Sequence, residues 1–113
     1  MDIETLRSYC LSKTGVSESF PFGEETLVFK VFGKIFLLTN LFSVPTSFNV
    51  KCEPEKALEW REKYLAVQPG YHMNKKHWNT VLIDGSIESG ILMEMINDSY
   101  DLVFNSIPKS KRI

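Results

Sequence analysis

The stretch of sequence that decides the fold runs from residue 27 to residue 39 and reads LVFKVFGKIFLLT. Leu27, Phe29 and Val31 recur with the two-residue period that is typical of a half-buried β-strand. Gly33 supplies the positive φ angle that a tight turn requires, because the preceding Phe tolerates such an angle poorly. Residues 35–39 are more apolar and run back as a central strand, so the stretch predicts a hairpin.

A third strand follows a break at Pro45. Phe48 and Val50 fall on one side of it, whereas Asn49 and Lys51 fall on the other. The connections near residues 33 and 44 have hairpin length, and this implies that the three strands pair antiparallel.

Helices are predicted before and after these strands. Residues 2–14 form the first helix, which Gly15 ends, and residues 17–25 form a loop. Pro54 opens a second helix, because proline suits the first helical turn. The apolar stripe of the first helix consists of Ile3, Leu6, Cys10 and Leu11. The inner face of the second helix is expected to consist of Ala57, Leu58, Arg61, Tyr64 and Leu65.

The last part of the chain adds two strands and a helix. Residues 71–73 are a candidate short strand, and residues 78–83 form a clearer one that a turn at 84–85 closes. Residues 86–106 supply the last helix, in which the polar residues 97–99 suggest a break.

The predicted element order is α-β-β-β-α-β-β-α. It favours a two-layer α+β fold, with a mostly antiparallel five-stranded sheet, helices on one face and the other face open. A chain of 113 residues fits a single domain spanning residues 1–113.

Composition excludes several classes of protein. Hydrophobic residues make up 43% of the chain and charged residues 24%, which is the balance of a globular domain and not of a disordered or collagen-like chain. A net charge of −1 excludes a uniformly basic nucleic-acid coat. The charged first residues indicate no signal peptide, and the longest uncharged run, residues 35–50, is too short to span a membrane. Cys10 and Cys52 are too few for a disulfide framework, so we expect a reduced, cytoplasmic protein.

The charges are distributed unevenly along the chain. Residues 26–51 contain Lys30, Lys34 and Lys51 and no acid, whereas residues 84–101 contain five acids and no basic residue. A basic tail of Lys109, Lys111 and Arg112 ends the chain. If helices cover one face, the open sheet face is basic and attracts phosphates despite the small net charge. Equally, strand lysines can serve only to prevent edge pairing, and Glu simply favours helices.

Residues 69–79, PGYHMNKKHWN, interleave aromatic side chains with Lys, His and Asn and contain no acid. Such a surface stacks on bases or pairs with phosphates. Trp78 offers a stacking face, Lys75 and Lys76 offer charges, and His77 gains a charge below neutral pH. Alternatively, Trp78 and Tyr71 belong to the core, which we favour for each of them, and the two lysines are solvated in a loop.

No catalytic arrangement is visible in the sequence, and we expect no metal or cofactor. His72 and His77 lie five residues apart, which is off the spacing that places two ligands on one helix face, and no acid separates them. Cys52 acts as a nucleophile only if a histidine meets it in space. A pocket that gathered Cys52, His72, His77 and Tyr100 would indicate an enzyme or a ligand-binding protein.

The run of residues 71–81, YHMNKKHWNTV, followed by Asp84 and Gly85, resembles the signature of the MmcQ/YjbR family. Other segments agree in order: residues 15–16, 21–23, 28–34, 51–52, 99–103 and 107–109. The resemblance therefore covers nearly the whole chain. It implies a small α+β domain of order α-β3-α-β2-α, CyaY-like and similar to secretion chaperones. It also implies DNA binding through a double-wing arrangement of strands, and no established reaction.

Two functions follow as expectations for a protein that we expect to be a monomer, although the sequence does not determine its oligomeric state. The first is DNA binding, with the phosphate backbone contacting Lys30, Lys34, Lys51, Lys75, Lys76, His77 and Trp78. The alternative is a chaperone-like module that binds a protein through exposed Phe32, Phe42 or Phe48 beside Pro45. A lysine-lined sheet face favours DNA, and an apolar one favours a protein partner.

Overall fold

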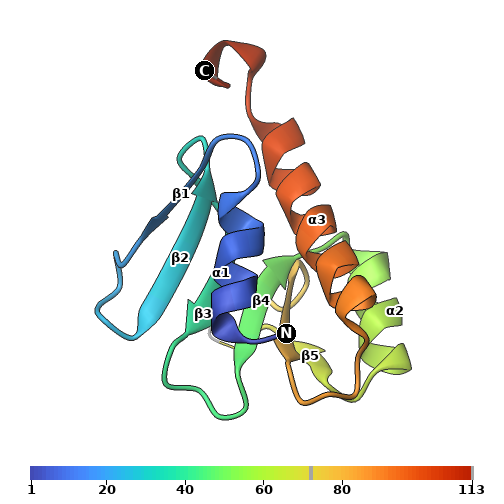
Figure 1. Cartoon of the computed structure of the whole chain (residues 1–113). Helices are drawn as coiled ribbons and strands as arrows, with labels where there is room; N and C mark the ends of the chain where they lie inside the picture. Colours follow the sequence, from blue (N-terminus) through green and yellow to red (C-terminus); the bar gives the residue numbers. More distant parts are fainter. Residues whose placement is uncertain (72, 113) are drawn as a thin grey trace.

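The computed structural model describes residues 1–71 and 73–112 (Figure 1). Its helices are α1 (Ile3–Leu11), α2 (Pro54–Lys63) and α3 (Ser89–Ser106), with a short 3₁₀ turn, η1 (Lys109–Lys111). Its strands are β1 (Val16–Ser19), β2 (Thr26–Val31), β3 (Lys34–Asn40), β4 (Ser47–Lys51), β5 (Val67–Pro69) and β6 (Trp78–Leu82).

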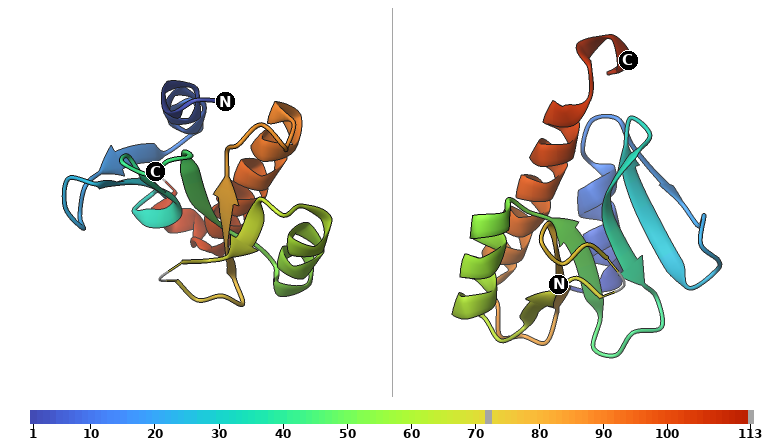
Figure 2. Two further views of the ribbon diagram at one scale, coloured as in Figure 1. Left: turned by 90° about the horizontal axis from the view of Figure 1, so that it is seen from below. Right: turned by 180° about the vertical axis from the view of Figure 1, so that it is seen from behind.

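The strands form one sheet in the order β1-β2-β3-β4-β6-β5, and the paired neighbours are antiparallel. The predicted α+β class, the antiparallel sheet and the helices on one face are confirmed. Helix α1 lies on one side of the sheet, and the loop residues 70–71 and 73–77 lie on the other side (Figure 2). One layer of the domain is therefore helical, and the second sheet face is left to this loop and to solvent.

The core lies between the helices and the sheet. Leu6 and Cys10 of α1 are fully buried, as the predicted stripe requires. Phe29 and Phe48 enter the same cluster from β2 and β4, and Ile96 enters it from α3. The predicted alternation holds for membership of this cluster, because Val28, between Leu27 and Phe29, is buried but lies outside it.

The β2–β3 turn differs from the prediction at one residue. Gly33 has the expected positive φ, 87°, but Phe32 also has a positive φ, 45°. Turns with two positive φ angles match the right-handed twist of paired strands. Phe32 is held by its neighbours: its N–H donates to Gly15 O at 2.9 Å, and its ring centroid lies 6.1 Å from that of Phe104. Packing therefore offsets the strain that phenylalanine meets in this region.

The predicted loop over residues 17–25 was wrong at its start. Residues Val16–Ser19 form β1, which pairs with β2 through Val16 and Val31 and the residues that follow. The strand is short and polar, so it shows no apolar alternation. A bidentate hydrogen bond between Arg7 of α1 and Glu18 fastens it to the helix layer. Over the described residues the sheet thus has six strands and not five.

The predicted strand at residues 71–73 was also misplaced. The edge strand is β5, Val67–Pro69, which pairs with β6 from Val67↔Val81 to Pro69↔Asn79. Tyr71 lies in a turn beyond it. A three-residue edge strand that ends in proline carries little pattern, because proline donates no ladder hydrogen bond.

Helix α2 buries only part of the predicted face, which includes Ala57. Ala57 and Trp60 are its buried residues, whereas Leu58 and Leu65 are 55% and 98% exposed. Trp60 was left out of the expected inner face although it lies three residues after Ala57. The buried residues still follow the helical spacing. The face that turns toward the core is the one that carries Trp60, because tryptophan has a large apolar area to bury.

Helix α3 begins later than predicted and has no break at residues 97–99. Ser99 is fully buried and faces the sheet, where its hydroxyl donates to Phe36 O at 2.5 Å and accepts from Lys51 N at 2.8 Å. Asp98 accepts from Lys56 at 2.6 Å, and Asn97 accepts from Tyr9 at 2.8 Å. The polar residues therefore join the helix to its neighbours and do not interrupt it.

Candidate binding face of the sheet

Two of the predicted lysines lie on the open face of the sheet, near the same end of it. Lys30 is opposite Ser17 of β1 and Ile35 of β3, and Lys51 is opposite Trp78 of β6. Residues that are direct partners across antiparallel strands share a face. This face is opposite the core, because the neighbours of these residues along each strand, such as Val50, are core residues. We call residues 30, 51 and 78 the basic row.

The basic row lies at one end of the sheet, where β2 and β4 finish and β3 and β6 begin. Lys75, Lys76 and His77 form the turn that leads directly into Trp78, so they belong to the same end. The backbone of this turn is fixed, because Trp78 N donates to Asn74 O at 2.9 Å and Cys52 N donates to His77 O at 2.7 Å.

The two lysines of the turn differ in whether a hydrogen bond holds the side chain. Lys75 Nζ donates to Gly70 O at 3.1 Å, and its own carbonyl accepts a hydrogen bond from Arg61. Lys76 is exposed, and its backbone N–H donates to Asn74 Oδ1 at 2.9 Å. Lys76 therefore offers the more mobile charge of the two.

Lys34 does not join the basic row. It is paired with Val31, a core residue, so it falls at the margin of the helix-covered side of the sheet and is exposed there. The sequence placed it with the others only because it lies in the same acid-free segment.

The charges of the basic row and its turn are not neutralised locally. In the described part of the chain, the carboxylate ion pairs are Arg7–Glu18 at 2.5 Å and Lys56–Asp98 at 2.6 Å. Both involve helical basic residues, and neither uses Lys30, Lys51, Lys75 or Lys76. Lysines without an acidic partner at one end of the sheet together create a local positive potential.

A groove of about 430 Å³ lies on the same open face, beside the basic row. Its wall is formed by the loop after β5, the β1–β2 connection and strands β2, β3 and β4. The lining residues are Phe22, Thr26, Ile35, Leu38, Thr39, Asn40, Asn49, Tyr71 and Met73. Sequence reasoning missed this groove, because its residues come from separate segments that only the sheet brings together.

Hydrogen bonds hold the loop over the sheet at the groove. Tyr71 N donates to Thr80 Oγ1 at 2.9 Å, and Thr80 Oγ1 donates to Asn49 Oδ1 at 2.5 Å. The side chain of Tyr71 is 71% exposed, which corrects the expectation that it enters the core. Trp78, expected in the core, is instead half-buried on the open face.

Most of the chain matches the model of a known protein family. The YjbR family model matches residues 11–102 of the chain. The chain belongs to the YjbR family. It is 40% identical over 106 residues to the uncharacterised protein YbdF of Escherichia coli O157:H7, covering 94% of this chain and 87% of that one. It is 30% identical over 112 residues to the uncharacterised protein YjbR of E. coli strain K12, covering 99% and 95%.

Solved structures agree with membership of the YjbR family. The crystal structure of the Deinococcus radiodurans protein DR2400, domain DUF419, has a TM-score of 0.91 at 38% identity, covering 97% of this chain and 84% of that one. A Pseudomonas syringae protein reaches 0.79 at 25% identity, covering 91% and 99%. Since YbdF and YjbR are themselves uncharacterised, family membership establishes the fold and no activity.

In this YjbR-family chain, apolar side chains gather at the opposite end of the sheet from the basic row. Phe42 is 69% exposed and Val44 is 95% exposed in the β3–β4 connection. Phe48, which the sequence offered as an exposed contact, is fully buried, and Phe32 packs against the core. Of the three aromatic residues proposed for a protein contact, Phe42 alone is exposed at the surface.

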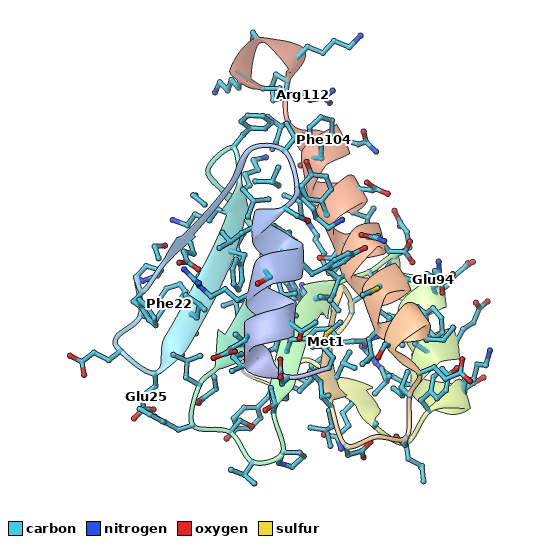
Figure 3. The ribbon with its side chains drawn as sticks, in the orientation of Figure 1. Met1, Phe22, Glu25, Glu94, Phe104 and Arg112 are labelled. Carbon is cyan, nitrogen blue, oxygen red and sulfur yellow. The ribbon has the colours of Figure 1, made fainter. Side chains whose placement is uncertain are left out.

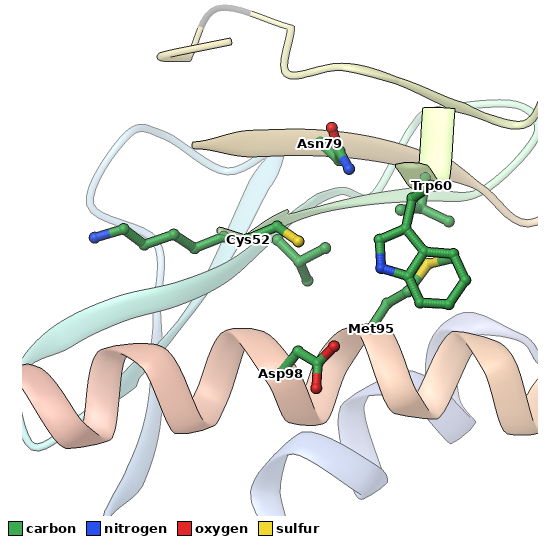
Figure 4. A pocket seen from close by; sticks show the side chains of 8 residues that line it. Cys52, Trp60, Asn79, Met95 and Asp98 are labelled. Atoms are coloured by element: carbon green, nitrogen blue, oxygen red, sulfur yellow. The ribbon is translucent and has the colours of Figure 1, made fainter. Parts of the chain in front are cut away.

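Among the described residues, neither His77 nor Tyr100 lines the cavity beside Cys52. The cavity beside Cys52 has a volume of about 10 Å³, roughly one water molecule (Figure 4). Burial raises the pKa of the Cys52 thiol to about 11, so the thiol stays protonated near neutral pH. Tyr100 donates to Thr14 O at 2.6 Å, in the connection after α1. His72 lies outside the described residues.

Residues 1–71 and 73–112 hold no group of three or more His, Cys, Asp or Glu side chains that could bind a metal ion. None of the helices described there combines the length and the apolar character that crossing a membrane requires.

Proposed function

We propose that this YjbR-family chain is a nucleic-acid-binding module that contacts the phosphate backbone with the basic end of its open sheet face. The supporting observation is that Lys30 and Lys51 lie near the same end of this face, with Lys51 directly opposite the aromatic Trp78, and that neither lysine is paired with a carboxylate among the described residues. Lysine ammonium groups bind phosphates as point charges, and their local field acts even when the net charge of the protein is near zero.

The turn of residues 75–77 extends this contact. Lys76 adds an exposed charge, and Lys75 adds a charge held by Gly70. Lys34 contributes from the margin of the sheet and not from the row.

The proposed role is binding and not catalysis. Cys10 and Cys52 are buried free thiols, and burial raises the pKa of each, to about 12 and about 11. Thiols of this kind are inert as nucleophiles. Two free thiols also fit a reducing compartment, so we place the protein in the cytoplasm as part of this proposal.

A titration with a fluorescently labelled random-sequence duplex tests the proposal. We expect binding at low salt that weakens steeply as salt rises, because each bound phosphate releases counterions. Lys75→Ala with Lys76→Ala should weaken binding to all sequences and flatten the salt dependence by about one to two phosphate contacts. Lys63→Ala, on helix α2, removes the same kind of charge from a residue outside the row and should change neither. No binding at low salt would contradict the proposal.

A second candidate function is a contact with a protein partner at the apolar end. It is supported by Phe42 and Val44, two apolar side chains that are both strongly exposed in one short connection. Cross-linking in cell extract, with the wild type beside Phe42→Ser with Val44→Ser, tests it. A partner that the wild type retains and the variant loses supports this function. Equal retention by both would count against it.

A further inference from the structure

The groove on the open face has the chemistry of a site for a flat, partly polar ring. Phe22 and Tyr71 supply aromatic walls, and Leu38 and Ile35 supply an aliphatic floor. Its volume of about 430 Å³ lies in the range of small-molecule sites, roughly 300–1,000 Å³. Aromatic side chains stack on nucleobases, and such stacking tolerates any base because every base has a π-face.

Two amide side chains give the groove its donors. Asn49 Oδ1 accepts from Thr80, and Asn40 Oδ1 accepts from Phe42 N at 2.9 Å. Both oxygen atoms are therefore used inside the protein. Within the described residues, neither amide nitrogen has a hydrogen-bond acceptor, so both NH₂ groups are free to donate to a ligand. Carbonyl oxygens and ring nitrogens of bases are acceptors of the matching kind.

The lining of the groove is uncharged, and two lysines lie next to one part of it. Ile35, which lines it, is the direct partner of Lys30, and Asn49, which also lines it, is two residues from Lys51 on the same face of β4. Two residues along a strand span about 7 Å. A ligand seated in the groove thus meets neutral, apolar and amide groups along its body and two lysines next to that part of the groove. This arrangement is complementary to a nucleotide, whose base is neutral and whose phosphate is an anion.

We propose that the groove holds one nucleotide of a single-stranded nucleic acid, with its base between Phe22 and Tyr71 and its phosphate toward Lys30 and Lys51. This inference rests on the proposed nucleic-acid binding and specifies the form of nucleic acid. A base in a duplex is stacked and paired, so it reaches a recessed groove only after it is unstacked. A single strand presents its bases without that cost, and its neighbouring phosphates follow the row toward the turn of residues 75–77.

Phe22→Ala is the variant that tests the groove. Phe22 is 65% exposed, so its loss should leave the fold intact. Phe20→Ala is the matched control, because Phe20 is 49% exposed in the same β1–β2 connection and does not line the groove. Labelled oligo(dT) of 15 nucleotides and a duplex of equal length are titrated by anisotropy over a series of salt concentrations, and dTMP is used as competitor.

The expected result is tighter binding of oligo(dT) than of the duplex, with a loss of about tenfold for Phe22→Ala and none for Phe20→Ala. The loss should be equal at all salt concentrations, because stacking releases no counterions, whereas Lys30→Ala with Lys51→Ala should reduce the salt dependence.

Other outcomes separate this inference from the proposed function. Equal, salt-sensitive binding of duplex and single strand, unchanged in Phe22→Ala, overturns the groove site and leaves phosphate-backbone binding in place. Binding of dTMP that needs Phe22, without binding of either oligonucleotide, overturns the single-strand assignment. No binding of any probe at low salt overturns both the inference and the proposed function.

Discussion

The hydroxyl oxygen of Ser99 accepts a hydrogen bond from the backbone N–H of Lys51 at 2.8 Å. The same hydroxyl donates to Phe36 O at 2.5 Å, so one side chain of α3 joins the facing backbones of β3 and β4. This hydrogen-bond bridge is made at Lys51, which belongs to the basic row. Helix α3 therefore fixes the backbone that carries a lysine of the proposed phosphate contact.

Ser99→Ala should destabilise the domain by about 2 kcal/mol, because it leaves the part-buried N–H of Lys51 and the buried carbonyl of Phe36 without partners. Urea unfolding measures the free energy of unfolding. Ser106→Ala is the control: Ser106 Oγ donates to Val103 O at 2.6 Å within the same helix, at an exposed position, and its loss should cost less than about 0.5 kcal/mol. Equal stability of the two variants would contradict the bridging role of Ser99.

Gly15→Ala should destabilise more than Gly33→Ala. Both glycines have a positive φ, 77° and 87°, so each substitution costs about 1 kcal/mol in backbone strain. A Cβ on Gly15 would also lie 2.5 Å from Phe32 Cζ, whereas nothing lies within 4 Å of a Cβ on Gly33. The additional loss of stability in Gly15→Ala measures how firmly Phe32 is packed between Gly15 and Phe104. Thermal melts of the two variants give the comparison, and equal melting temperatures would show that the ring simply moves away.

Phe104, which packs against Phe32, also contacts the tail that follows α3. Arg112 lies over the ring of Phe104, 4.5 Å from its centroid, and both are labelled where the helix leads into the tail (Figure 3). Phe104→Leu should loosen both the Phe32 turn and the tail, and lower the melting temperature by a few degrees. A melting temperature equal to that of the wild type would contradict this account of the β2–β3 turn.

The sequence was a good guide where one face of an element is buried and the other is not. The alternation in residues 27–31 and 48–51 correctly predicted which side chains enter the core. It was a poor guide to β1, which reads VSES and owes its place to pairing with β2 and to the Arg7–Glu18 contact. Such tertiary interactions leave no periodic pattern along the chain.

The candidate site, too, could be predicted from the sequence only in part. Acid-free segments indicated Lys30, Lys51 and the turn of residues 75–77, and strand pairing brings them to one end of the sheet. Composition could not separate Lys34 from them, because the side of the sheet depends on the register at the hairpin. The groove was not predictable, since Phe22, Asn49 and Tyr71 are far apart in sequence.

The two cysteines should resist thiol reagents in the folded protein. Burial raises the pKa of Cys10 to about 12 and that of Cys52 to about 11, so thiolate is scarce at pH 8. A colorimetric thiol reagent should find little reactive thiol before denaturant is added, and two thiols afterwards. Rapid reaction of one thiol in the native protein would contradict the buried position of that residue.

The same thiols should make the domain less stable at alkaline pH. Their pKa values are higher in the folded state than the roughly 8.5 of an unfolded chain, so the folded state binds more protons between these values. The free energy of unfolding therefore falls as pH rises from about 8.5 towards about 11. Cys52→Ala should reduce the slope of this fall, measured by urea unfolding across the pH series. An unchanged slope would contradict the assignment to Cys52.

The central claim is that the basic row binds the phosphate backbone, and the salt dependence of binding tests it most directly. Affinity for a labelled 15-nucleotide single strand is measured over a salt series for the wild type, for Lys30→Ala with Lys51→Ala, and for Lys63→Ala. We predict that the slope of log affinity against log salt becomes shallower by about 1.4 in the double variant, about 0.7 for each lost phosphate contact, and stays unchanged in Lys63→Ala. The same slope in all three proteins would contradict the claim.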